Sequence, residues 1–351
     1  MINSPIKKYC ILLQWLKMKN IFHQLLNNIN TYSMNYRRYL ALLLIIFVGV
    51  IFSPKSGNGS IIFLEPENMT DIIRQISEIG IIALGMTLVI ISAGIDLSVG
   101  SILALSACVV SFFLTDASFS SSNVFLGILS PIIIALIIST IIGVLNGLAV
   151  AYLKIQPFIV TLAMMFGVRG LARIVTNNAN IDIGFGDDLA SNFAEIFSEK
   201  YLVIMIYIIL CIILSVLFKR TIYGRLIRAI GDNQRAAKYT GIAIEKIQLG
   251  VYALCGFLAG LAGIIHAAQN HQGSPNAGVM YELEAIAAVV IGGTALSGGK
   301  GSISGTIIGT LIMGIMTNIL RLNNVDANIE MVLKSIIIII AVKIQTGRSE
   351  S

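Results

Sequence analysis

The sequence predicts an all-α fold: a polytopic membrane protein with about ten transmembrane helices, some of them short or broken. Three observations support this prediction. First, 56% of the 351 residues are hydrophobic and only 12% are charged, which does not fit an ordinary soluble surface. Second, several stretches hold the roughly 20 apolar residues that a helix needs to cross the hydrocarbon core. Third, the sequence lacks the apolar and polar alternation of a membrane barrel, and only a helix then satisfies its own backbone polar groups in lipid.

The candidate spans follow one another within a single transmembrane domain at residues 36–345. They cover residues 36–53, 70–94, 97–114, 124–153, 156–175, 201–218, 248–268, 283–297, 302–320 and 329–345. The spans that begin at 97 and 283 are short for a membrane crossing. We expect a cytoplasmic loop at 219–248 and a cytoplasmic tail at 346–351.

Basic and acidic residues fall on opposite sides of the predicted bundle. With the amino terminus inside, the basic residues on the cytoplasmic side are Arg37, Arg38, Lys154, Lys219, Arg220, Arg225, Arg228, Arg235, Lys238, Lys246, Lys300 and Arg348. The other side receives an acidic loop with Asp182, Asp187, Asp188, Glu195 and Glu199. Cytoplasmic loops of membrane proteins are rich in Lys and Arg. The position of the basic residues therefore explains the net charge of +6 by membrane topology and not by nucleic-acid binding. Both termini are predicted to be cytoplasmic.

Residues 1–35 form neither a span nor a signal peptide, because their longest apolar run is too short. Apolar residues nevertheless recur there at helical spacing, among lysines. They are Ile11, Trp15, Met18, Phe22, Leu25 and Ile29. This pattern predicts a basic amphipathic helix at the membrane interface. The alternative is an overextended reading frame in which Met34 is the natural start.

Polar residues interrupt the second apolar run at residues 92–101. A charge at the centre of a membrane helix costs roughly 2.5–3.5 kcal/mol on insertion scales, so Asp96 should face protein or water. Gly94 and Gly100 flank it, and a broken helix is the expected geometry. Asp96 and Ser98 are candidates for the solute pathway. The alternative is a turn between spans in which Asp96 only caps the next helix.

A similar interruption precedes the fifth span. Pro157 stands where a new helix begins, a position that needs no amide donor. Asn146, Gln156 and Thr161 are candidates for lining a polar route through the membrane. For each of them, hydrogen bonding between helices without any transport role is the alternative.

The loop at 219–248 carries the signals of a short helix of about two turns. Asp232 is a suitable N-cap, and Gly241 can take the left-handed conformation that ends a helix. Ala236 and Ala237 give this helix a flat face that suits insertion into a groove of a cytoplasmic partner. A solvated basic loop is the alternative, but such a loop needs neither caps nor a face of small residues.

A glycine-rich stretch at 292–306 invites comparison with a phosphate-binding loop, and the comparison fails. Thr294 stands where the pattern needs its first glycine, and Gly301 follows Lys300 where Ser or Thr is needed. We therefore expect no nucleotide site in this chain.

Small residues in the ninth span, Gly305, Gly309 and Gly314, instead permit close packing of helices in lipid.

The cysteines show neither disulfide nor metal-ligand spacing, so we expect apolar fillers and no metal or other cofactor. They are Cys10, Cys108, Cys211 and Cys255.

Four sequence blocks occur in one order between about residues 68 and 345, and together they are specific. They are Gly-Ile-Asp-Leu-Ser-Val-Gly at 94–100, Gln-Pro-Phe-Ile-Val-Thr-Leu at 156–162, Gly-Asp-Asn-Gln-Arg-Ala-Ala-Lys-Tyr-Thr-Gly-Ile at 231–242 and Tyr-Glu-Leu-Glu-Ala-Ile-Ala-Ala-Val-Val-Ile-Gly-Gly-Thr at 281–294. With these blocks the chain resembles the permease subunits of bacterial ATP-binding cassette importers for ribose, xylose, galactose and autoinducer-2. The first 35 residues depart from that pattern and inherit no function from it.

The resemblance implies a transmembrane subunit that translocates a monosaccharide across the bacterial inner membrane, driven by a partner ATPase, and that is not itself an enzyme. It implies three protein partners: a second permease copy, identical or different, a cytoplasmic ATP-binding cassette ATPase, and a periplasmic or lipid-anchored sugar-binding protein. Membrane lipid surrounds such a bundle, and no nucleic acid takes part. The resemblance also implies that the segment from 231 to 241 is the coupling helix. Its coupling residues would be Gly231, Asp232, Asn233, Ala236, Ala237 and Gly241.

The residues leave one other transport mechanism open. An ion-coupled secondary transporter of a small polar solute would use an intramembrane carboxylate such as Asp96 as a proton or sodium site. A membrane enzyme would need clustered ligands or a nucleophile arrangement, and His23, His266 and His271 offer none.

Overall fold

The chain folds almost entirely into helices. The computed structural model describes residues 34–116, 124–184, 186 and 188–346. Its helices are α2 (Met34–Phe52), η1 (Ile62–Leu64), α3 (Pro66–Ile91), α4 (Val99–Thr115), α5 (Val124–Ala151), α6 (Pro157–Val175), α7 (Leu189–Ser198), α8 (Lys200–Arg220), α9 (Ile222–Asp232), α10 (Gln234–Tyr239), α11 (Ile244–Asn270), α12 (Tyr281–Ile291), α13 (Ile303–Leu322) and α14 (Ala327–Thr346). Two short strands, β1 (Ile181–Asp182) and β2 (Gln272–Gly273), pair antiparallel. The predicted helical class is confirmed for the described residues.

Two predicted segments lie mostly outside the described residues. Only the last two residues of the amphipathic helix predicted at 1–35 are described, and only the first residue of the tail at 346–351.

The helices match the predicted spans in order, but the count of about ten crossings is not confirmed. In the described part of the chain, six helices are long and apolar enough to cross a membrane: α3, α5, α6, α8, α11 and α13. α12 has 11 residues, and at about 1.5 Å per residue it covers roughly half of a 30 Å hydrocarbon core. It ends at Ile291, earlier than predicted, because Gly292 and the left-handed Gly293 (φ +89°) turn the chain there.

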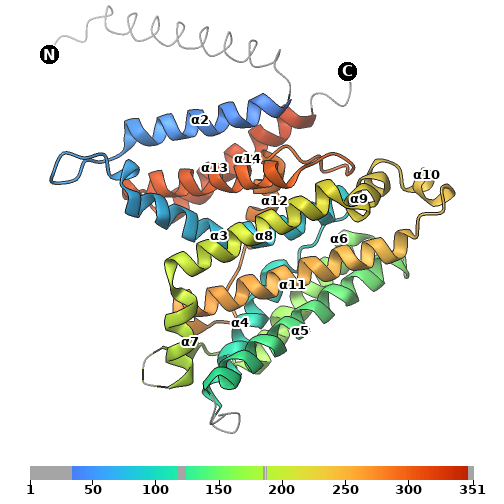
Figure 1. The fold of residues 1–351 in the computed structure, drawn as a ribbon, viewed down its shortest axis with the longest axis horizontal. Coiled ribbons are helices and arrows are strands. Elements are labelled where there is room, and N and C mark those ends of the chain that lie inside the picture. Colours follow the sequence, from blue (N-terminus) through green and yellow to red (C-terminus); the bar gives the residue numbers. More distant parts are fainter. Residues whose placement is uncertain (1–33, 117–123, 185, 187, 347–351) are drawn as a thin grey trace, which may run out of the picture.

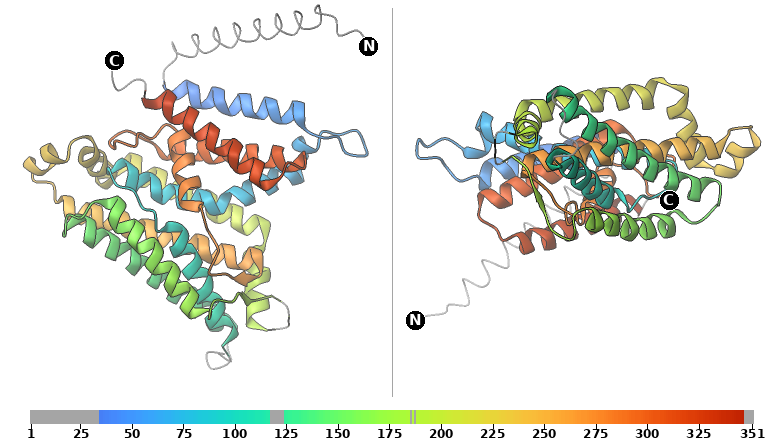
Figure 2. Two further views of the ribbon diagram at one scale, coloured as in Figure 1. Left: turned by 180° about the vertical axis from the view of Figure 1, so that it is seen from behind. Right: turned by 90° about the horizontal axis from the view of Figure 1, so that it is seen from below.

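α11 runs through the middle of the bundle and packs against α5, α4 and α3. On one side of it lie α2, α13 and α14, and on the other side lie α5 and α6 (Figures 1 and 2). The largest cluster of buried apolar residues comes mainly from α3, α4 and α11. The functional groups described below therefore lie where α3 and α4 meet the helices around α11.

Glycines bring helix backbones together in this core, as the sequence predicts. A Cβ built on Gly305 would overlap the Gly292 carbonyl, and one on Gly309 would overlap the Ala288 carbonyl, so α13 lies directly against α12. A Cβ on Gly314 would overlap the Ile76 side chain of α3. The described cysteines are free and buried, which confirms their assignment as apolar fillers. They are Cys108, Cys211 and Cys255.

The two ends of the bundle carry different parts of the chain. Figure 1 shows the start of α2 and the end of α14 at the same end of the bundle as α9 and α10. The turn between α2 and η1 lies at the opposite end, together with α7. The start of α2 and the end of α14 thus lie on the same side as the loop at 219–248, and the cytoplasmic location of that side stays a prediction.

Candidate functional site

The loop at 219–248 folds into two helices, α9 and α10, where the sequence predicted one. Gly231 and Asp232 are the last residues of α9, so the prediction that Asp232 caps the short helix is wrong. The N-cap of α10 is Asn233, whose side-chain oxygen accepts from Ala236 N at 3.0 Å. The physical reason is that Ile227 and Ile230 are buried and keep the chain helical through Asp232. Gly241 has φ +81°, which confirms the predicted left-handed residue after the helix.

The two alanines of α10 face different surroundings. Ala237 is buried against Ile230 of α9 and Ile244 of α11. Ala236 is exposed and so cannot share one flat outer face with Ala237. Tyr239, three residues after Ala236 and on the same side of the helix, is 92% exposed. Sequence reasoning missed this tyrosine, although a large aromatic side chain in a short basic helix is a signal for a contact with a partner.

A second group of polar residues lies at the break between α3 and α4. Asp96 is fully buried there, and its Oδ1 accepts from Ser98 N at 2.9 Å and from Ser98 Oγ at 2.6 Å. Asp96 thus closes the turn that leads into α4, and the broken geometry predicted for this segment is confirmed. Ser98 occupies the N-cap position itself, but its side chain makes no cap bond.

Three neighbouring helices attach to this break. Asn146 of α5 donates to Ser98 Oγ at 2.8 Å, and Thr161 of α6 donates to the Ile95 carbonyl at 3.2 Å. Tyr252 of α11 donates to the same carbonyl at 3.5 Å. Asp96, Ser98, Asn146 and Thr161 are each fully buried. The structure therefore brings together four of the five predicted pathway residues, as a packed polar cluster, and adds Tyr252, which the sequence did not single out.

Gln156, the fifth predicted pathway residue, lies apart from this cluster. It is exposed and lines a cavity of about 720 Å³ between the start of α6, the start of α11 and α10. Ala93 at the break also lines this cavity, and so do the basic residues Lys154, Arg235 and Lys238. Residues of α10 and Ala93 at the α3–α4 break therefore line the same cavity.

Arg169, which sequence reasoning missed, is a basic residue within the candidate span α6. Its Nη1 donates to the Pro275 carbonyl at 2.8 Å and to the Ala277 carbonyl at 2.5 Å. These bonds hold the irregular segment between β2 and α12, where Gly278 lies against Gly100 at the start of α4. Irregular backbone at membrane depth needs such partners, because lipid supplies none.

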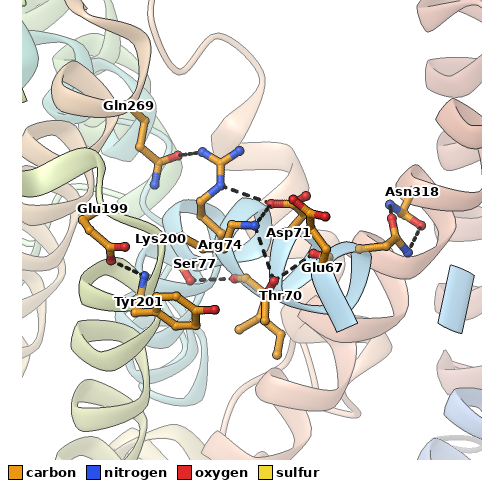
Figure 3. A network of polar contacts seen from close by, with 12 residues as sticks. Glu67, Thr70, Asp71, Arg74, Ser77, Glu199, Lys200, Tyr201, Gln269 and Asn318 are labelled. Carbon is orange, nitrogen blue, oxygen red and sulfur yellow. Dashed lines mark hydrogen bonds and ion pairs between the residues drawn. The ribbon is translucent and has the colours of Figure 1, made fainter. Parts of the chain in front are cut away.

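A charged network lies at the end of the bundle opposite α10. Lys200 Nζ is 2.7 Å from Asp71 Oδ1, and Arg74, 3.9 Å from the same oxygen, donates to Gln269 Oε1 at 3.3 Å. Figure 3 shows how these side chains join the start of α3 to α8 and to the end of α11. Sequence reasoning missed the network because its members come from three distant segments.

At the same end, the predicted acidic loop contains the amphipathic helix α7, which was not predicted. Asp188 caps it: the carboxylate accepts from Ser191 N at 2.8 Å and from Ser191 Oγ at 2.9 Å. These hydrogen bonds hold the pKa of the Asp188 carboxyl below its usual value. This part of the acidic loop is therefore an ordered, negatively charged helix start.

Further polar side-chain contacts join helices inside the bundle. Glu78 Oε2 of α3 lies 2.8 Å from His266 Nδ1 of α11. Lys334 of α14 lies 2.9 Å from Glu284 of α12 and 2.7 Å from Glu330. In the described part of the chain, no group of three or more His, Cys, Asp or Glu side chains is placed to hold a metal ion.

In the described residues, the six candidate spans and the buried polar break between α3 and α4 define a multi-spanning membrane protein. Residues 68–342 match the family described as the permease component of branched-chain amino acid transport systems, and the chain belongs to this family. Together with the sugar permeases reported next, this match confirms the resemblance seen in the four sequence blocks.

The chain is also similar to several sugar permeases. It is 39% identical to the ribose import permease of Haemophilus influenzae, over 90% of this chain and 94% of that protein. It is 36% identical to the fructose import permease of Rhizobium meliloti, over 87% and 82%. It is 31% identical to the xylose transport system permease of Haemophilus influenzae, over 91% and 98%. No solved structure gives a significant match to this chain.

Proposed function

We propose that this chain is the transmembrane subunit of an ATP-binding cassette importer that moves a monosaccharide across the bacterial inner membrane. The observation that carries the proposal is the similarity to a ribose import permease over 90% of the chain. The exposed helix α10 supports it, because it lies in the loop where the resemblance expects a coupling helix. The fructose and xylose relatives support a pentose or hexose as the substrate class.

A partner ATPase supplies the energy in this proposal, because the glycine-rich stretch at 292–306 lacks the residues of a phosphate-binding loop. ATP binding closes the ATPase, and α10 passes that closure to the membrane bundle. A periplasmic or lipid-anchored binding protein delivers the sugar at the opposite end. The permease contributes a bundle with two arrangements, and ATP biases the equilibrium between them.

The uptake of labelled ribose into proteoliposomes tests this proposal. The permease is reconstituted with its partner ATPase and binding protein, and uptake is compared with and without ATP. We expect uptake only when ATP and the ATPase are both present. Uptake driven by a proton or sodium gradient without the ATPase contradicts the proposal and supports the secondary transporter.

We place α9, α10 and both termini in the cytoplasm, since the basic residues cluster at that end of the bundle. In a variant without native cysteines, a cysteine at the exposed position of Arg235 should resist an impermeant maleimide in intact spheroplasts. A cysteine at the exposed position of Glu195 should react. The opposite labelling pattern contradicts this topology.

We infer that α6 faces a second permease copy. In the most apolar stretch of α6, 17% of the residues are buried and the mean hydropathy is 1.8. The corresponding stretches of α5 and α8 are each 28% buried, and they are more apolar, with mean hydropathies of 2.7 and 3.0. The value for α6 equals that of α11, which is 72% buried. A Cβ built on Gly167 or Gly170 meets no heavy atom within 4 Å. Small residues let helices approach closely in lipid, so the face with Gly167 and Gly170 suits close contact with another helix.

Oxidative cross-linking in native membranes tests the α6 contact. In the cysteine-free background, Gly167→Cys should give a disulfide-linked dimer, because an added side chain at this position points away from the rest of the chain. Ile212→Cys on α8, where the native side chain is 59% exposed, is the lipid-facing control and should stay monomeric. Equal cross-linking of the two variants, or of neither, contradicts the placement of α6 between identical copies.

A further inference from the structure

The end of α9, the end of α3 and the glycine turn after α12 meet at one point, backbone against backbone. Gly299 N donates to the Ile91 carbonyl at 2.9 Å, which joins the turn to the last residue of α3. A Cβ built on Gly231 would overlap both the Ile91 oxygen and the Gly299 nitrogen. Only glycine therefore fits at position 231 without displacing one of the other two segments.

The turn also requires glycine for its own shape. Gly298 and Gly299 have φ of +90° and +72°, which L side chains rarely adopt. A Cβ on Gly298 would lie 2.9 Å from the Ala93 Cβ and 3.0 Å from the Gly231 oxygen. We call these five residues, Ile91, Ala93, Gly231, Gly298 and Gly299, the glycine junction.

On one side, the glycine junction is attached to α10. Ala237 of α10 packs on Ile230, the residue just before Gly231, and on Ile244 at the start of α11. This apolar contact ties α10 to α9, so a displacement of α10 is carried to Gly231 and is not absorbed between the two helices. Packed apolar contacts of this kind shift as units because interiors are dense.

On the other side, the glycine junction is attached to the membrane bundle. Ile91 and Ala93 lead directly into the break that contains Ile95 and Asp96. The Ile95 carbonyl accepts from α6 and α11, and Asn146 of α5 reaches the same break through Ser98. A displacement of Ile91 therefore acts on three membrane helices at once.

We propose that the glycine junction is the contact through which movement of α9 and α10 is passed to the α3–α4 break, and from there to α5, α6 and α11. This proposal rests on the proposed function, because it requires an ATPase that moves α10. Gly231 is a positioning residue in this scheme, since it holds α9 against Ile91 and touches no substrate. Coupling between two sites travels through contiguous packed elements that can take two arrangements, and the glycine junction supplies the contiguous contact.

Gly231→Ala in the complete reconstituted importer tests the proposal. The readout is the amount of sugar taken up per ATP hydrolysed, which a loss of protein does not change. We expect this ratio to fall by roughly 5- to 150-fold, the factor by which coupled sites typically change each other's affinity. Two alanine variants serve as controls. Gly57→Ala meets no atom within 4 Å, whereas Gly314→Ala overlaps Ile76, away from the junction.

We expect Gly57→Ala to behave as wild type and Gly314→Ala to lower the amount of folded protein without changing the ratio. A wild-type ratio in folded Gly231→Ala overturns the proposal, and so does an equal fall of the ratio in Gly314→Ala. If the wild-type protein shows no ATP-driven uptake, the proposed function itself fails, which is a separate outcome.

A second measurement does not depend on any variant. Hydrogen exchange of the segment at 89–98 is compared in the wild-type importer with and without a non-hydrolysable ATP analogue. We expect nucleotide binding to change exchange in this segment, because the Ile91 contact shifts with α9. Unchanged exchange at 89–98, in a complex where exchange in α10 does change, overturns the proposal.

Discussion

Replacing Asp96 with leucine is expected to abolish ATP-driven sugar uptake, whereas Asp96→Asn retains most of it. Leucine removes the acceptor for Ser98 N and Ser98 Oγ in a fully buried site. Each buried donor left without a partner costs roughly 1–3 kcal/mol. The break then loses the turn that starts α4, and with it the anchoring of Asn146. Uptake in proteoliposomes, with folded protein measured by gel filtration, checks this expectation.

Asparagine preserves this cluster for two reasons. Its side-chain oxygen can accept from Ser98 as Oδ1 does. Its amide N–H₂ takes the place of Asp96 Oδ2, which has no hydrogen-bond partner in the structure; Asn146 Oδ1 also has none. Asp96→Asn therefore removes one buried acceptor that lacks a donor and keeps the acceptor that Ser98 uses.

The same pair of variants separates the two transport mechanisms. A carboxylate that cycles a proton cannot be replaced by an amide, so a secondary transporter loses coupled uptake in Asp96→Asn as completely as in Asp96→Leu. Gradient-driven uptake without any ATPase, absent in Asp96→Asn, contradicts the importer assignment itself.

The long helices and the break at residues 92–98 follow from local sequence. Apolar runs of membrane length predict the spans, and the glycines around Asp96 predict the interruption. α12 is shorter than predicted because hydropathy does not register the turn at Gly292 and Gly293, although the glycine pair signals it.

The site is predictable only in part, because its remaining features depend on contacts between distant segments. Local caps suggested a helix near Ala236, but the burial of Ala237 comes from Ile244 on another helix. The resemblance implied Gly231 only as a coupling residue, and the physical reason for a glycine there is the close approach of Ile91 and Gly299. No local pattern joins Arg169 to carbonyls more than a hundred residues away.

A charged side chain at Ala236 is expected to disconnect the permease from its ATPase and leave the bundle folded. Ala236 is exposed and lies on the same side of α10 as Tyr239, which is 92% exposed, so we expect the added carboxylate to leave the packing of the permease unchanged. A long charged side chain cannot enter a close helix-in-groove contact, and Tyr239→Ala should weaken the same contact by removing its aromatic anchor. We expect ATPase co-purification and ATP-driven uptake to be lost together in Ala236→Glu.

Ala237→Glu is the matched comparison, one residue along the same helix. Its charge is placed against Ile230 and Ile244, so this variant should lose the packing of α10 on α9 and show more proteolysis of the loop at 219–248. Ala236→Glu should show native proteolysis of that loop, because its side chain points to solvent. Normal ATPase association and uptake in Ala236→Glu removes α10 from the coupling role, while a proteolysed loop in that variant shows that its effect arises within the permease.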